Sequence, residues 1–167
     1  HLTPYLSPPS WRYPETTANW QNGTFTDWHG PYYGFAHCEL TLSHGEGACS
    51  FAHYGEWLRR EHPEALERLR EQQPRPFPEL GDLYVSSLPF ALHHSHWLAE
   101  RLSAYLRQRT PADAPFFSFV GFPDPHHPFV PCADIAPDFE DCAVEHFSVR
   151  YLVLDAARDA RVRPYVC

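Results

Sequence analysis

A buried strand followed by a stiff loop is predicted for residues 115–131, PFFSFVGFPDPHHPFVP. The apolar run Phe116 to Phe122 is rich in aromatic residues and too short for an isolated helix, which favours a strand covered on both faces. Three prolines in the next six residues end the strand, because each fixes its own φ and restricts the residue before it. Ligands bind at the carboxyl ends of strands in open α/β sheets, so we expect a site at this loop.

The loop carries one carboxylate, Asp124, and two imidazoles, His126 and His127. An imidazole titrates near neutral pH, so these histidines are candidates for proton transfer. Loop histidines bonded to nearby carbonyls are the simpler interpretation, and the loop sequence alone leaves both open. Asp124 follows Pro123 and is more easily explained as a turn-forming residue than as a partner that orients an imidazole.

The composition predicts a folded chain and restricts its partners. Its 167 residues suffice for one domain, and 43% hydrophobic residues are too many for a disordered chain. A formal charge of −8 without basic clusters argues against nucleic acid or an anionic membrane as partner. No apolar run reaches ~18 residues and nothing near His1 resembles a signal peptide, so we expect a soluble protein; the sequence does not indicate its compartment.

The order of elements predicts an α/β fold with a mainly parallel sheet. Alternation of apolar and polar residues predicts a strand over Gly34–Leu42. Helices are expected from Phe51, with Ser50 as N-cap, then from Pro63 to about residue 73, and over Ser95–Arg109, with Ser95 as its cap. Strand, helices and strand in this order indicate crossover helices between parallel strands.

Residues 1–34 show neither a helical nor a strand period and predict a long loop fixed by its aromatic rings. Long loops within a domain often line or cover a site. We therefore assign Trp28, Tyr32 and Tyr33 as candidate residues of a substrate mouth. A loop that only wraps the surface is the alternative.

Three histidines, His93, His94 and His96, precede the third helix and suggest a zinc site. Of their spacings, only that of His93 with His96 suits two ligands on one helix face. No cysteine or carboxylate lies beside them to complete a closed site. Surface or capping histidines are therefore the preferred interpretation, and no metal ligand is assigned.

Several segments resemble sulfatases of the arylsulfatase type, members of the alkaline-phosphatase-like superfamily. PFFSFVGFPDPHHPF resembles their strand and P-H-x-P loop, in which a histidine contacts the sulfate ester; this implies a catalytic role for His126 and a substrate contact for His127. DWHGPYYGFAHCELTLSHGEG, HYGEWLRREHPEA and SSLPFALHHSHWLAERLSAYL resemble bacterial members in the same order. Residues 1–131 thus resemble the central part of a sulfatase catalytic domain. Residues 132–167 are a divergent tail, in which 147–154 has the pattern of a strand.

The resemblance also indicates which parts of such an enzyme this sequence does not contain. HLTPYLSPP resembles the continuation of the family's G-K-x-H motif, with His1 as its histidine. The signature C-x-P-x-R, whose Cys or Ser becomes formylglycine, is absent, and so are recognisable calcium-binding aspartates. The implied fold is a three-layer α/β/α domain with a mainly parallel sheet, present here as a partial domain.

The resemblance implies hydrolysis of a small-molecule sulfate ester. In the family, hydrated formylglycine attacks sulfur and Ca²⁺ holds the sulfate; here His126 would protonate the leaving group and His1 would assist the formylglycine hydroxyls. Other parts of the domain would supply the nucleophile and the calcium ligands. Two alternatives stay open: a phosphate or phosphonate ester hydrolase of the same superfamily, and a non-catalytic His-rich metal-binding or interaction domain. The last alternative predicts zinc binding that depends on His93, His94 and His96.

Overall fold

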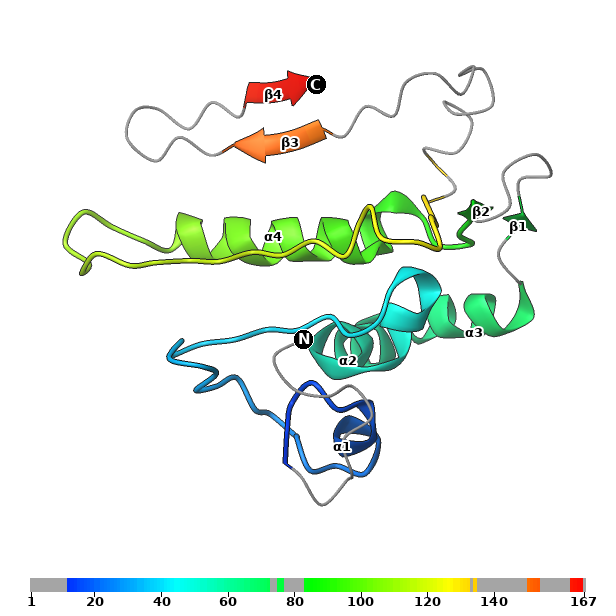
Figure 1. The fold of residues 1–167 in the computed structure, drawn as a ribbon, viewed down its shortest axis with the longest axis horizontal. Coiled ribbons are helices and arrows are strands. Elements are labelled where there is room, and N and C mark those ends of the chain that lie inside the picture. The colour runs from blue at the N-terminus through cyan, green and yellow to red at the C-terminus, as the bar shows by residue number, and fades with distance from the viewer. Residues whose placement is uncertain are drawn as a thin grey trace. The chain divides into compact units, whose positions relative to one another are not determined.

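A computed structural model describes residues 12–72, 75–76, 83–132, 134, 150–153 and 163–166. The chain divides into two compact units, residues 1–135 and residues 136–167 (Figure 1). In the second unit, β3 (Arg150–Val153) pairs with β4 (Arg163–Val166) in antiparallel register. β3 lies inside the segment 147–154 that the sequence predicts as a strand.

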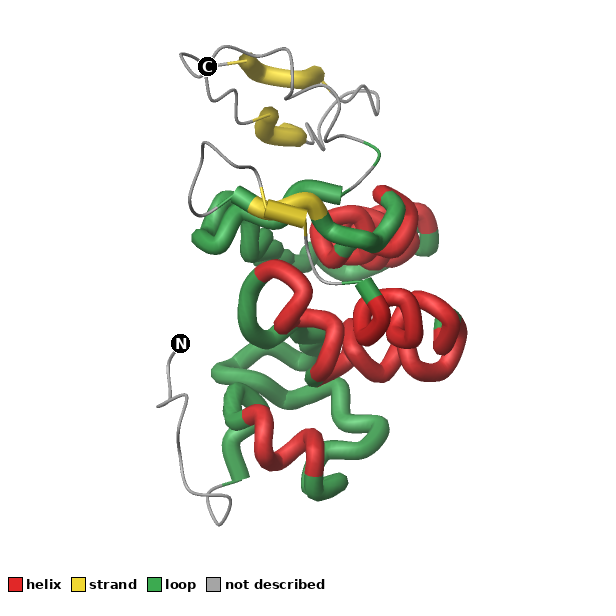
Figure 2. The backbone as a smooth tube through the Cα atoms, turned by 90° about the vertical axis from the view of Figure 1, so that its right-hand side faces the viewer, coloured by secondary structure: helices red, strands yellow, loops and turns green. Residues whose placement is uncertain are grey.

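The regular elements of the first unit are mainly helices, which long loops connect in its described part (Figure 2). Its elements are α1 (Thr17–Gln21), the 3₁₀ helix η1 (Gly45–Ser50), α2 (Ala52–Glu61), α3 (Pro63–Glu71), β1 (Arg75–Pro76), β2 (Tyr84–Val85), the 3₁₀ helix η2 (Phe90–Leu92) and α4 (His94–Arg107). β1 and β2 pair antiparallel over two residues. None of the described helices has both the length and the apolar character that crossing a bilayer demands.

The three helices predicted from the sequence are confirmed as α2, α3 and α4, but two of their caps are not. Pro63 is the first residue of α3, as predicted. Ser50 instead ends η1, and Phe51 occupies the N-cap position of α2. At α4 the N-cap is His93, whose Nδ1 accepts a hydrogen bond from the Ser95 backbone N–H at 3.4 Å. The imidazole takes the position because the Ser95 hydroxyl is engaged elsewhere, on the carboxylate of Asp124.

The main hydrophobic core joins α2 to α4. Tyr54 and Leu58 on α2 are fully buried, and the Tyr54 ring lies 5.5 Å from that of Trp97 on α4. Burial of a side chain such as Leu58 contributes about 1.5–3 kcal/mol to stability. The Tyr54 hydroxyl donates a hydrogen bond to the Leu92 carbonyl at 2.6 Å, so the core also contains a satisfied polar contact.

A second core fixes the loop that precedes η1 through aromatic rings, as predicted. The prediction of a loop throughout residues 1–34 is wrong at α1, which forms a short helix there. The second core contains Trp20, Phe25, Leu42 and Ala52. His53 lies beside it, and its ring bonds on both edges: Nδ1 accepts from the Leu40 N–H at 2.9 Å and Nε2 donates to the Trp28 carbonyl at 2.6 Å.

The prediction of a buried strand over Phe116–Phe122 is wrong. The segment is extended, but no strand pairs with it, and the side chains of Phe117 and Phe119 are 77% and 75% exposed. The apolar composition of the run predicts burial on both faces. In the structure, no described residue covers its outer face. Burial depends on neighbouring strands, which a local sequence does not contain.

This extended segment runs back along α4. At one end the Phe116 ring lies 5.4 Å from that of Tyr105, near the end of the helix. At the other end Asp124 accepts a hydrogen bond from Ser95, in the first turn. The helix therefore sets the position of the loop that follows the segment.

The predicted strand Gly34–Leu42 is not formed: Gly34 lies in a turn, Phe35 forms an isolated bridge with Tyr32, and residues 37–42 pair with no described strand. This segment nevertheless runs beside residues 116–122 in the same direction, as a parallel neighbour would. The rings of Phe35 and Phe117 lie 5.9 Å apart, and nine residues later in both segments those of His44 and His126 lie 3.6 Å apart. No backbone hydrogen bond joins the two segments, both of which the structure describes in full.

A parallel pairing with hydrogen bonds occurs directly after the histidine loop. Leu83 and Phe129 form a parallel bridge, and the N–H groups of Tyr84 and Ser86 donate to the carbonyls of Phe129 and Pro131 at 2.8 and 2.9 Å. These contacts do not build a sheet among the described residues. The three-layer α/β/α fold with a mainly parallel sheet therefore stays a prediction.

Replacement of Gly55 by alanine should destabilise the protein, although alanine is the better helix former. A Cβ atom at this position in α2 would lie 2.9 Å from the backbone carbonyl oxygen of Cys49 and 2.9 Å from the carbonyl carbon of Ser50. We expect a loss of about 1–3 kcal/mol in the free energy of unfolding by urea, because backbone must move. As the matched control, Gly121→Ala meets only the Phe119 ring at an ordinary 3.6 Å and should change stability by less than about 0.5 kcal/mol. Equal effects of the two substitutions would contradict this packing.

The protein should lose stability between pH 6.5 and pH 4 through His53. Burial lowers the pKa of His53 from 6.5 to about 4. The unfolded state therefore binds a proton that the folded state rejects, so this contribution is complete above pH 6.5 and is lost as the pH falls to 4. It amounts to at most about 3 kcal/mol. In His53→Asn, unfolding free energies measured by urea titration should fall less steeply across this interval. The exposed-residue control, His37→Gln, should keep the wild-type slope, and a wild-type slope in His53→Asn would refute the assignment.

Candidate functional site

Three imidazoles meet at the proline-rich loop. The rings of His126 and His44 stack face to face, with centroids 3.6 Å apart and planes 9° from parallel. The ring of His127 lies 4.7 Å from that of His126. His126 Nδ1 contacts the His127 carbonyl at 2.5 Å, and since a carbonyl only accepts, Nδ1 carries the proton. In the neutral ring, Nε2 then has a lone pair available for proton transfer.

His44 enters the site from the other extended segment. It is the N-cap of η1 and has extended backbone angles, and burial together with the neighbouring His126 and His127 lowers its pKa. The next residue, Gly45, has φ of +53° and passes so close to Val130 that a Cβ would lie 2.8 Å from Val130 Cγ2. Only glycine satisfies both conditions. This close approach brings His44 to the loop of His126.

Asp124 contacts the start of α4 rather than His126. Ser95 Oγ donates to Asp124 Oδ2, from which His94 Nε2 lies 3.3 Å and His93 Nδ1 lies 4.0 Å away. Burial disfavours ionisation of the carboxyl, but the contacts with His94, Ser95 and His93 outweigh it and lower the pKa of Asp124 to about 2. The carboxylate is therefore ionised at neutral pH and fixes the loop to the helix.

His93 and His94 are buried, with 9% and 2% of their surface exposed. His93 Nε2 donates to the Val130 carbonyl at 3.2 Å, and burial, followed by the neighbouring His94, lowers the pKa of His93 to about 4. His96, by contrast, packs its ring on Phe90. The pair expected from spacing, His93 with His96, is therefore not formed. The structure instead joins the adjacent residues His93 and His94 with a carboxylate that lies 30 positions further along the chain.

The other predicted site residues lie elsewhere. His1 is outside the described residues. Trp28 belongs to the second core, where its ring contacts those of Trp20, Phe25, Tyr32 and His53. The Tyr32 hydroxyl bonds to Glu15, which together with burial raises its pKa, and Tyr33 is exposed with its ring edge-on to that of Tyr32. Substrate contacts by these three aromatic residues stay a prediction.

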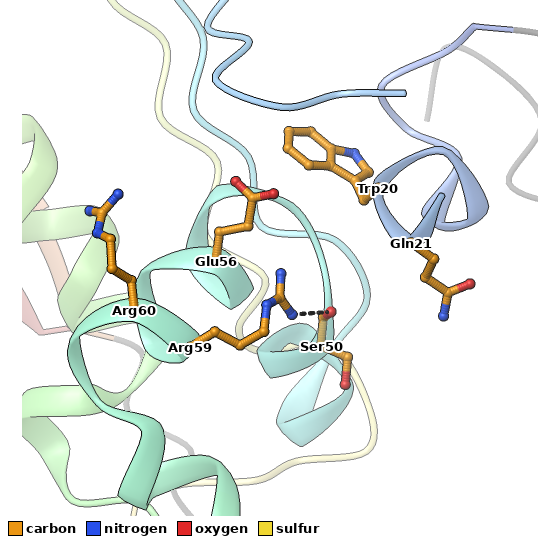
Figure 3. Close-up of a pocket in the computed structure, with 6 residues that line it drawn as sticks. All are labelled: Trp20, Gln21, Ser50, Glu56, Arg59 and Arg60. Carbon is orange, nitrogen blue, oxygen red and sulfur yellow. Dashed lines mark hydrogen bonds between the residues drawn. The ribbon is translucent and has the colours of Figure 1, made fainter. Parts of the chain in front are cut away.

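A surface pocket of about 540 Å³ lies on α1 and α2 (Figure 3). Its lining residues are Trp20, Gln21, Ser50, Glu56, Arg59 and Arg60. Both guanidinium groups are engaged, Arg59 with the Ser50 carbonyl at 2.9 Å and Arg60 with Glu61 at 2.8 Å. The pocket contains none of the residues predicted for the site.

The sequence predicted His126 and His127 and missed His44; it named His94 only within the group of His93, His94 and His96, for which surface or capping roles were preferred. His44 closely follows the extended segment 34–42, as His126 follows the segment 116–122, and this shared position after a predicted strand was the available signal. No local signal in the sequence predicts that His94 lies beside Asp124, because this contact arises from the return of the chain along α4.

Replacement of Asp124 by asparagine should lower the free energy of unfolding by about 1–2 kcal/mol, since it removes the charge that Ser95 and the buried His94 face. Urea unfolding monitored by circular dichroism measures the change. Asp113→Asn is the matched control, because Asp113 is exposed and bonds only to the nearby Thr110. It should cost about 0.5 kcal/mol or less. A loss in Asp124→Asn no larger than in the control would contradict the anchoring role of Asp124.

The arrangement supports two kinds of chemistry. Imidazoles in contact at an exposed loop can take up and release protons, and imidazoles beside a carboxylate can bind a metal ion. Comparison with protein-family models, with curated proteins and with solved structures found no match to the chain.

Proposed function

We propose that this chain is part of a hydrolase domain that cleaves sulfate esters, with His126 as the proton donor to the leaving group. One observation carries the proposal. Two extended segments run in the same direction, and His44 and His126 meet just after their ends. In α/β enzymes, ligands bind at the carboxyl ends of parallel strands. The nucleophile would come from residues outside these 167.

The chemistry of His126 supports this role. Sulfate ester hydrolysis releases an alcohol or phenol, and a general acid near neutral pKa assists that step. His126 is exposed, and its Nδ1–H is held by the His127 carbonyl, so Nε2 would take up a proton from solvent, which gives the imidazolium, and pass that proton to the leaving group. His127, adjacent and exposed, is proposed as a substrate contact. The function of His1 beside the nucleophile stays part of the proposal.

Calcium does not fit the residues described at this loop. Ca²⁺ takes six to eight oxygen ligands, whereas the loop offers the single carboxylate of Asp124 among imidazoles. The calcium ion of the proposed reaction would therefore be held by residues outside the chain studied here. The residues at hand bind, orient and protonate the substrate.

The proposal predicts that His126→Ala lowers kcat for an aryl sulfate by about 10²–10⁴-fold. The measurement uses the product of the complete open reading frame that contains these residues, assayed with an aryl sulfate and with the corresponding aryl phosphate. His62→Gln, at the junction of α2 and α3, is the control and should retain wild-type activity.

The outcomes distinguish the related activities. Faster turnover of the phosphate than of the sulfate, with the same dependence on His126, would establish the phosphoester hydrolase instead. Turnover of either substrate that does not change in His126→Ala would overturn the catalytic assignment, and so would the absence of any turnover of both substrates.

A further inference from the structure

We infer that His93, His94 and Asp124 bind a divalent transition-metal ion, and that the chemistry of the donor atoms selects Zn²⁺. The candidate ligand atoms of these three residues all lie within 4.8 Å of one another. This site is distinct from the exposed cluster of His44, His126 and His127 and does not depend on the hydrolase proposal.

The distances suit a tetrahedral ion. Zn²⁺ binds imidazole nitrogen and carboxylate oxygen at about 2.0–2.2 Å, which places neighbouring tetrahedral donors about 3.3 Å apart. His94 Nε2 lies 3.3 Å from Asp124 Oδ2, and His93 Nδ1 lies 4.0 Å from the same oxygen. Closing the 4.0 Å distance to about 3.3 Å needs a movement of the Asp124 carboxylate, which is partly exposed.

The unsatisfied nitrogen of His94 points independently to a ligand. His94 is 2% exposed, and its Nε2 is buried without a hydrogen-bond partner. The atom faces Asp124 Oδ2 at 3.3 Å but without the alignment of a hydrogen bond. A buried polar atom in this state is rare in native structures and calls for an explanation such as a bound ion. A metal ion between the two atoms supplies the missing partner.

Neighbouring groups orient two of the three ligands. His93 Nε2 donates to the Val130 carbonyl, so the proton is on Nε2 and the lone pair on Nδ1, which is the atom that faces Asp124. Metal-binding histidines commonly donate their second N–H in this way. The Nδ1 lone pair accepts the long 3.4 Å hydrogen bond from the Ser95 N–H, which a bound metal ion would replace. Ser95 Oγ donates to Asp124 and fixes the carboxylate.

The donor set favours zinc over the hard cations. Two imidazoles and one carboxylate are a known ligand set of open zinc sites, whereas Ca²⁺ and Mg²⁺ prefer oxygen donors. Three protein ligands leave a coordination position for water. Bound metal would connect the histidine loop to the start of α4 through direct bonds.

A second group with metal-binding residue types, His29, His37 and Glu39, provides the internal control. Glu39 already accepts two hydrogen bonds from Arg101, so a guanidinium neutralises its charge. His29 and His37 are exposed at this group. Weak adventitious zinc binding would depend on these residues rather than on His94.

The test is a titration of the metal-free chain with Co²⁺, a spectroscopic substitute for Zn²⁺, followed by displacement with Zn²⁺ and by thermal unfolding. We expect one Co²⁺ per chain with the intense visible absorption of a four- or five-coordinate ion, its loss on addition of Zn²⁺, and a higher Tm with Zn²⁺. Asp124→Asn and His94→Gln should each weaken Zn²⁺ binding at least about tenfold. His96→Gln and His37→Gln should bind as the wild type does.

Two variants at the site keep the test conclusive even if one of them does not fold. Asp124 is partly exposed, so Asp124→Asn should remain folded and tests the site even if His94→Gln does not fold. Wild-type binding by Asp124→Asn, or an equal loss in His96→Gln or His37→Gln, would overturn the inference. The zinc titration needs no substrate. Absence of zinc binding would therefore leave the sulfate ester proposal intact, and absence of sulfatase activity would leave the zinc proposal intact.

Discussion

The hydrogen bond from the buried Tyr54 hydroxyl to the Leu92 carbonyl connects the two parts of the molecule on which the site depends. It holds α2 against the last residue of η2, immediately before His93. Leu58 and Trp97 complete this contact with apolar surface. The position of the first turn of α4, and with it the position of both buried imidazoles, follows from this packing.

Local features of the sequence predicted α2, α3 and α4 correctly, because periodicity and Pro63 act within a few residues, whereas the short α1 lies in a segment predicted as a loop. The caps of α2 and α4 were predicted less well: Ser95 is a good capping residue by type, but its hydroxyl bonds to Asp124, which is distant in sequence. The exposure of residues 116–122 was not predictable, since burial of an apolar run depends on neighbouring strands, which the described residues do not supply. For the site, His126 and His127 were predicted from their position after an apolar run, whereas His94 needs the long-range return of the chain.

The two histidine clusters share the same loop and differ in environment. His126 and His127 are exposed, and His44 approaches them because Gly45 permits close contact with Val130. His93 is buried, and it bonds to the carbonyl of the same Val130. Val130 thus contacts both groups: its side chain lies against Gly45, next to His44, and its carbonyl accepts a hydrogen bond from the buried His93. Histidines that lie close together can therefore differ in their chemistry, because burial disfavours the charged form of an imidazole.

The exposed aromatic segment 116–122 has a consequence for the behaviour of the chain in solution. An extended apolar stretch with free backbone groups is a template for the addition of a strand from another copy. Pro115 and Pro123 flank it and lack the N–H groups that would continue a ladder, so they confine such pairing to the seven residues between them. Concentration, rather than temperature, is therefore the variable to which the colloidal stability of these 167 residues should be most sensitive.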